Sequence, residues 1–154
     1  MRIIRKLTKS TIVALFVVLV SVVFFQVVAR YVFNRPPAWT EELARYCQVW
    51  IILLTAPICI HKGSHLAVDY FSHMLNPTAR YLMDILIGLL ILLYVTVVTV
   101  FGIRLMMVGR FQISPALGIN MSVIYAVLPL AGSLMILEAV IRILNMIKTK
   151  RAHL

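Results

Sequence analysis

The chain has 154 residues, of which 62% are hydrophobic and 13% are charged, and its mean hydropathy is +1.00. Soluble globular domains are about 45–50% apolar, and a chain of this length cannot bury such an excess in a core of its own. The net charge of +10 could suggest a nucleic-acid-binding protein, but the basic residues lie at the termini and at the ends of apolar runs, which argues against it. This pattern is typical of an integral membrane protein, with basic ends that contact anionic lipid.

The first expected span follows a short basic N-terminal segment. Four basic residues precede a charge-free run over 10–29. A signal peptide has an apolar core of about 7–15 residues and a small-residue cleavage site, whereas a spanning helix needs about 20 apolar residues. We therefore expect this run to be retained as a spanning helix over about 10–32.

The second charge-free run, over 46–60, is short for a spanning helix. We expect it to extend to about 44–61. An amphipathic stretch over 38–45 precedes it, in which the aromatic and apolar residues share one side and the charged residues lie off that side. The two prolines before this stretch end the first helix. We expect 38–45 to form an interfacial helix in the headgroup plane.

Two further charge-free runs complete the predicted fold. They predict a third span over about 82–104 and a fourth over about 120–145. The fold class is therefore all-α integral membrane, a four-helix transmembrane protein with an amphipathic interfacial helix before helix two. No composition shift or linker divides the chain, so we expect one membrane domain over 1–154.

Charged residues near the helix ends predict local contacts. Asp84 and Arg104 stand at the two ends of the third span, where the helix dipole favours an acid at the start and a base at the end. Glu138 and Arg142 are four residues apart, a spacing that predicts an ion pair on the fourth helix.

The orientation follows from the distribution of Lys and Arg, which favour the cytoplasmic side of a membrane. With four spans and a cytoplasmic N-terminus, ten basic residues lie inside and five outside. We therefore expect both termini in the cytoplasm. The inner residues are Arg2, Arg5, Lys6, Lys9, Lys62, Arg80, Arg142, Lys148, Lys150 and Arg151, and the outer ones are Arg30, Arg35, Arg45, Arg104 and Arg110.

The interiors of the four apolar runs carry no Asp, Glu, Lys, Arg or His. An ionisable residue within a membrane marks a proton, ion or ligand pathway by default. Its absence argues against transport by this chain alone. Cys47 and Cys59 have no metal-binding spacing and are expected to be apolar packing residues. No set of residues for nucleophilic or acid–base catalysis occurs, so we expect no enzyme.

Two alternatives stay open. His61 and His65 are four residues apart at the end of the second run, which is compatible with a haem-bearing membrane anchor of a redox complex. Under the simpler interpretation they are polar residues at the membrane interface, and Gly63 ends the helix. The second alternative is a self-contained channel or small exporter, against which the apolar interiors argue.

The segment from Arg30 to Asp69 resembles a known family, the small membrane subunit (DctQ type) of tripartite ATP-independent periplasmic (TRAP) transporters. The family pattern is an Arg-Tyr-x-Phe end to helix one, a Trp-x-Glu-Glu-x-x-Arg segment, a Trp in helix two and a Gly-x-His-x-x-Val-Asp stretch. A further match lies before and inside the fourth span. The matching positions are Arg30, Phe33, Asn34, Trp39, Glu41, Glu42, Arg45, Trp50, His65, Asp69, Gly118, Tyr125 and Pro129.

The resemblance implies a role. In that family a periplasmic binding protein captures an organic acid, either a carboxylate or a sialic-acid-like compound. A large membrane subunit moves it by an elevator-like motion coupled to sodium. The small subunit resembles a fixed scaffold in the bacterial inner membrane that pairs with the large one. This implies that the chain holds no substrate, sodium ion or other cofactor. Its short basic tail favours a large subunit on a separate chain.

The resemblance also suggests where the binding protein docks. The outer-side charged residues are candidates for transient contact with the substrate-loaded binding protein. They are Arg30, Arg35, Glu41, Glu42 and Arg45.

Overall fold

The computed structural model describes residues 2–35, 37–62 and 77–151, and nearly all of them are helical. The elements are α1 (Arg2–Val32), α2 (Ala38–Lys62), α4 (Pro77–Val108), η1 (Gly109–Phe111), α5 (Met121–Tyr125) and α6 (Val127–Arg151). Within these residues four stretches are long and apolar enough to cross a bilayer: Ile3–Val32, Ala38–Ile60, Ile85–Phe111 and Met121–Leu144. The predicted all-α, four-helix membrane fold is confirmed.

The helices extend beyond the apolar runs that predicted them. The first helix begins at Arg2 and not near residue 10, because Lys, Arg and Leu are good helix formers and continue the backbone hydrogen bonding past the apolar run. Residues 38–45 are helical, as expected, but they are the first turns of α2 and continue into the span without a break. Their position in the headgroup plane stays a prediction.

The fourth span is interrupted near its start. Asn120 caps α5, and its side-chain Oδ1 accepts a hydrogen bond of 2.9 Å from the backbone N–H of Ser122. The helix breaks at Ala126 and resumes as α6. Pro129 explains the break, because proline has no N–H to donate and its ring crowds the carbonyl of Tyr125, four residues earlier.

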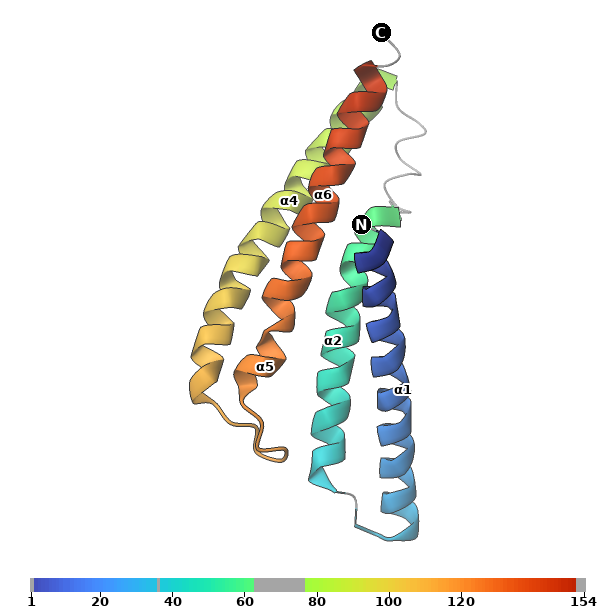
Figure 1. Ribbon diagram of the computed structural model, residues 1–154, viewed down its shortest axis with the longest axis vertical. Coiled ribbons are helices and arrows are strands. Elements are labelled where there is room, and N and C mark those ends of the chain that lie inside the picture. Colours follow the sequence, from blue (N-terminus) through green and yellow to red (C-terminus); the bar gives the residue numbers. More distant parts are fainter. Residues whose placement is uncertain (1, 36, 63–76, 152–154) are drawn as a thin grey trace.

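The chain forms two antiparallel helix pairs, α1 with α2 and α4 with α6, and α2 lies next to α6 (Figure 1). We call α1 with α2 the first hairpin, and α4 with α6 the second hairpin. Contact between α2 and α6 joins them. The core cluster lies where α2, α4 and α6 meet, and α1 adds no residue to it. Its buried members are Ile60, Val95, Ala131, Met135 and Ala139.

Glycines let the two helices of the second hairpin approach closely. A Cβ added to Gly132 on α6 would lie 2.1 Å from Thr99 Oγ1 and 3.0 Å from Thr99 Cβ on α4. A Cβ added to Gly102 would lie 2.8 Å from the Cβ of Leu128. Small residues at helix contacts are typical of membrane proteins, where close packing between helices does much of the stabilising.

This packing predicts that Gly132→Ala separates α4 from α6. Thr99 cannot rotate away, because its Cβ is itself too close, and we expect the overpacked variant to lose about 1–3 kcal/mol of unfolding free energy. The measurement is denaturant unfolding in detergent. Gly88→Ala is the matched control, since its Cβ would meet the movable Ile143 side chain at 3.1 Å and should cost much less. Equal losses in the two variants would contradict the packing argument.

Candidate functional site

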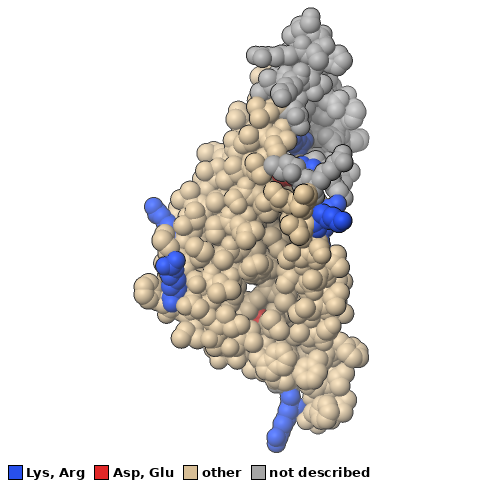
Figure 2. Space-filling view, in the orientation of Figure 1, with Lys and Arg blue, Asp and Glu red and all other residues tan. Residues whose placement is uncertain are grey.

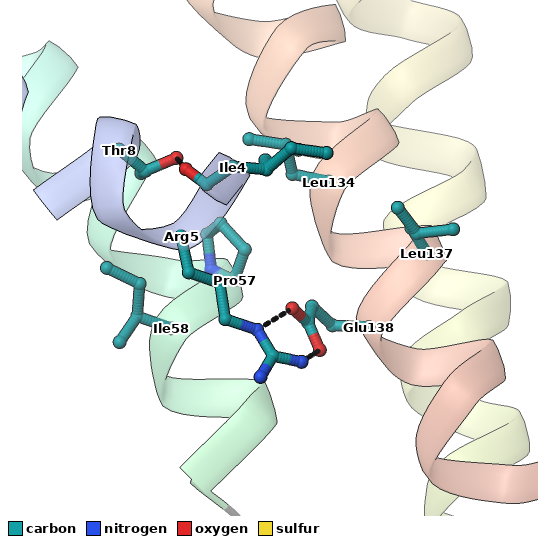
Figure 3. Close-up of a pocket in the computed structure, with 8 residues that line it drawn as sticks. All are labelled: Ile4, Arg5, Thr8, Pro57, Ile58, Leu134, Leu137 and Glu138. Atoms are coloured by element: carbon teal, nitrogen blue, oxygen red, sulfur yellow. Dashed lines mark hydrogen bonds and ion pairs between the residues drawn. The ribbon is translucent and has the colours of Figure 1, made fainter. Parts of the chain in front are cut away.

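An ion pair joins the two hairpins near the start of α1 (Figure 3). Arg5 Nε lies 2.7 Å from Glu138 Oε1, and Arg5 Nη2 donates to Glu138 Oε2 at 2.8 Å. The Glu138 side chain is 8% exposed and that of Arg5 is 26% exposed. Two parallel N–H···O bonds to a carboxylate fix both distance and orientation. The pair therefore ties α1 to α6 in one defined geometry.

A small cavity lies beside this pair, between α1, α2 and α6 (Figure 3). Its volume is about 20 Å³, which is room for about one water molecule. Most of its lining is aliphatic, including Ile4, Pro57 and Leu134. A cavity of this size cannot hold an organic acid, so it is no substrate site.

The partner of Glu138 differs from the one expected from the sequence. The i,i+4 spacing predicted an ion pair with Arg142, whereas the bidentate partner is Arg5, 133 residues away on another helix. Arg142 Nη1 is buried and has no hydrogen-bond partner among the described residues. Sequence spacing identifies neighbours on one helix but carries no signal for contacts between helices.

At the other end of α2, Glu42 binds the connection between η1 and α5. Its Oε2 accepts hydrogen bonds from the backbone N–H of Ala116 at 2.9 Å and of Leu117 at 3.0 Å. Its Oε1 accepts one of 2.5 Å from the Tyr46 hydroxyl. The carboxylate thus accepts from two backbone N–H groups of the loop that have no partner in a helix.

The loop that Glu42 binds is itself ordered by its own bonds. Ser114 is 2% exposed, and its Oγ accepts from the Leu117 N–H at 3.2 Å. Gly118 takes a left-handed backbone conformation with φ of 66°, which favours glycine, and donates to the Ser114 carbonyl at 3.0 Å. Ile113 and Asn120 form an antiparallel bridge across the loop. These bonds build a compact loop.

The structure divides the five expected docking residues into two kinds. Glu41 and Arg45 form an ion pair of 3.3 Å on the surface, and each side chain is 69% exposed. Arg30 and Arg35 are also exposed. Glu42 is half-buried and bound to its own chain. Four of the five are thus open to a partner, and the fifth has an internal role.

Other residues quoted from the sequence hold the turn between α1 and α2. The Trp39 ring stacks on Phe25 of α1, with centroids 6.0 Å apart and 25° between planes. Asn34 takes a left-handed conformation with φ of 50° just after α1, which suits asparagine at a helix end. Phe33 is 67% exposed and Trp50 is half-buried. His65 and Asp69 lie outside the described residues.

The span least buried within the described chain is α1. Only 6% of its most apolar window is buried within the chain, against 39% for the last span. Uncharged side chains cover most of the face shown in Figure 2, with the basic residues scattered near its edges. The exposed large side chains of α1 include Val13, Phe16, Val17, Val20, Phe24 and Val27. This helix presents its surface to lipid or to another membrane protein.

Comparison with known families decides the identity. The family described as "Tripartite ATP-independent periplasmic transporters, DctQ component" matches residues 19–149, which is most of the chain. This chain is a DctQ component. It is therefore a small subunit of a TRAP transporter and not an enzyme, and its four spans fit a multi-pass protein of the inner membrane.

Individual relatives agree with the family. The chain is 28% identical over 147 residues to the sialic acid TRAP transporter small permease protein SiaQ of Vibrio cholerae, covering 96% of this chain and 85% of SiaQ. It is 28% identical over 135 residues to the sialic acid TRAP transporter permease protein SiaT of Haemophilus influenzae, covering 88% of this chain but 22% of SiaT. The isethionate TRAP transporter permease protein DctMQ of Oleidesulfovibrio alaskensis is 28% identical over 135 residues, 82% of this chain and 21% of DctMQ. The chain thus spans about a fifth of the length of the two larger permease proteins.

Three of the DctQ motif residues that the structure describes, Glu42, Tyr125 and Pro129, contact other parts of the chain. Glu42 meets Ala116 and Leu117, from the segment that resembles the family before the last span. Tyr125 packs on Gly109, where an added Cβ would lie 2.7 Å from its ring. Pro129 lies beside the close contact at Gly102. Sequence reasoning missed the role of Arg5, because its partner is evident only when the helices are brought together.

The ion pair predicts a charge-dependent stability. Arg5→Gln leaves Glu138 buried beside aliphatic side chains, and we expect a loss of about 2 kcal/mol, less than for a fully buried pair because Arg5 is partly exposed. The measurement is denaturant unfolding of the purified chain in detergent.

The exchanged pair Arg5→Glu with Glu138→Arg serves as the control for this loss. It should recover part of the stability that either single reversal removes. An Arg5→Gln variant as stable as the wild type would show that the pair contributes nothing.

Proposed function

We propose that this DctQ component is the scaffold of a sodium-coupled TRAP transporter for an organic acid. In this proposal it packs against a large, elevator-type membrane subunit and keeps that subunit's stationary frame in place. The observation that carries the proposal is the exposed apolar surface of α1. This helix packs against α2, but most of its side-chain surface is not covered by the chain.

The polar chemistry of the chain supports a structural role. Among the residues that the structure describes, the buried charged side chain is Glu138, and it pairs with Arg5. The Glu42 carboxylate binds a loop of the same chain. The cavity beside the ion pair has room for about one water. A site for a hydrated cation or a carboxylate needs open polar groups at depth. We therefore place substrate and sodium in the large partner, with no cofactor held here.

The substrate class is proposed from the relatives' names. Those names refer to sialic acid and isethionate, both organic acids. We extend only the class to this chain, with a periplasmic binding protein as the transient partner that delivers it. The haem-anchor alternative is not favoured, since the family is a transporter component.

Purification from native membranes tests the scaffold role. With a tag on the C-terminus and extraction in mild detergent, we expect a large polytopic membrane protein to co-elute in roughly equal amount. An unrelated tagged membrane protein from the same cells is the control for non-specific capture. Elution of the chain alone, or with a haem absorbance band, would contradict the proposal.

Charge reversal at the expected outer end tests docking of the binding protein. Because Glu41 is exposed and Glu42 is not, we expect Glu41→Lys to reduce uptake severalfold at limiting binding protein, and less at high salt, which screens surface charge. The measurement is substrate uptake into liposomes that contain the complete transporter.

Saturating binding protein provides the control for this variant, because a docking defect disappears there and a folding defect does not. Unchanged uptake at every binding-protein concentration would remove Glu41 from the docking surface. Reversal of Glu42 is not informative here, since it would also release the loop that Glu42 binds.

A further inference from the structure

We propose that the two hairpins are separate bodies that two polar clasps lock into one arrangement. The first clasp is the Arg5–Glu138 ion pair, between α1 and α6. The second is the Glu42 carboxylate with the amides of Ala116 and Leu117, between α2 and the loop before α5. The lock is a property of this chain, and its value for transport rests on the proposed scaffold role.

Each clasp joins one hairpin to the other, and the two lie at opposite ends of the first hairpin. Arg5 lies near the start of α1, beside Pro57 and Ile58 close to the end of α2. Glu42 lies near the start of α2, at the end where the loop after η1 approaches it (Figure 1). Two fixed points at opposite ends of a shared contact prevent one hairpin from sliding along the other or swinging across it.

The apolar contact between the hairpins has no comparable directionality. Of the five buried core residues, one comes from α2, Ile60, and the other four come from α4 and α6. In a bilayer the apolar side chains gain little by leaving lipid for each other, so such contacts tolerate sliding and rotation. The hydrogen bonds of 2.7–3.0 Å that cross between the hairpins to a carboxylate do not tolerate such movement, because their strength falls steeply with misalignment.

The chain offers a matched control for the second clasp. Glu41 stands next to Glu42 on the same helix, carries the same charge and pairs only with the exposed Arg45 among the described contacts. Removing its charge therefore leaves both clasps intact. Glu42→Gln keeps the side chain's size but has one acceptor oxygen where the carboxylate has two. Its bonds to the loop amides also lose the negative charge that strengthens them.

Distance measurements between the hairpins test the lock. Spin labels are placed at the exposed positions Ile52 on α2 and Leu93 on α4, in a background with Cys47→Ala and Cys59→Ser, and the protein is held in lipid nanodiscs. We expect one narrow distance distribution in the labelled parent and in Glu41→Gln. We expect broader distributions in Arg5→Gln and in Glu42→Gln, and the broadest in the double variant.

Hydrogen exchange gives a second, label-free measurement. Glu42→Gln should speed exchange of the peptide that contains Ala116 and Leu117, and Glu41→Gln should leave it unchanged. A folded double variant, with helical circular dichroism intact, that keeps both the parent distance distribution and slow exchange would overturn the proposal.

If the double variant does not fold, the exchanged pair Arg5→Glu with Glu138→Arg decides. A distribution narrower than that of Arg5→Gln supports the lock, and one equally broad overturns it. Failure of the scaffold role is seen separately, because it appears as a parent chain that elutes without a large subunit while its own distances stay narrow.

Discussion

Because these helices are surrounded by lipid, the hydrophobic effect, which organises most soluble proteins, does not drive them together. Apolar side chains of α1 lose nothing by facing acyl chains, so burial does not determine where the helix lies. What remains is close packing, as at Gly132 against Thr99, and the pairing of polar groups that lipid cannot solvate. The Arg5–Glu138 pair follows from this constraint, because an unpaired buried charge is costly whereas a valine that faces lipid is not. The half-buried Glu42 carboxylate likewise pairs with amides of the loop.

Much of the fold could be predicted from the sequence, because a membrane span is a local property. A charge-free run near 20 residues indicates a helix whatever its neighbours are. Each predicted span overlaps a helix of the structure, and the break before Val127 has its cause in Pro129, three residues into the sequence of α6. The helix ends were less predictable. Backbone hydrogen bonding continues through basic residues that hydropathy excludes, as at the start of α1.

The polar contacts could not be predicted, because they depend on how helices far apart in the sequence pack. Arg5 was counted only as an N-terminal basic residue, and its partner was assigned by i,i+4 spacing to Arg142. The spacing rule holds for isolated helices, where the nearest opposite charge is one turn away. Within a bundle, a bidentate carboxylate partner on another helix competes with it. The motif around Glu42 marked the right region but not the loop that the side chain meets.

Glu41 and Glu42 show why a shared motif does not assign roles by itself. The two residues differ by one position, which on an α-helix is about 100° of rotation. That rotation turns Glu41 toward solvent and Arg45, and Glu42 toward the loop amides of the second hairpin. A motif with two adjacent acids therefore combines a surface position with a structural one. If the chain acts as the proposed scaffold, the structural acid bears on transport through the shape of the bundle. The internal geometry of the bundle is thus the property through which this chain would act on its partner.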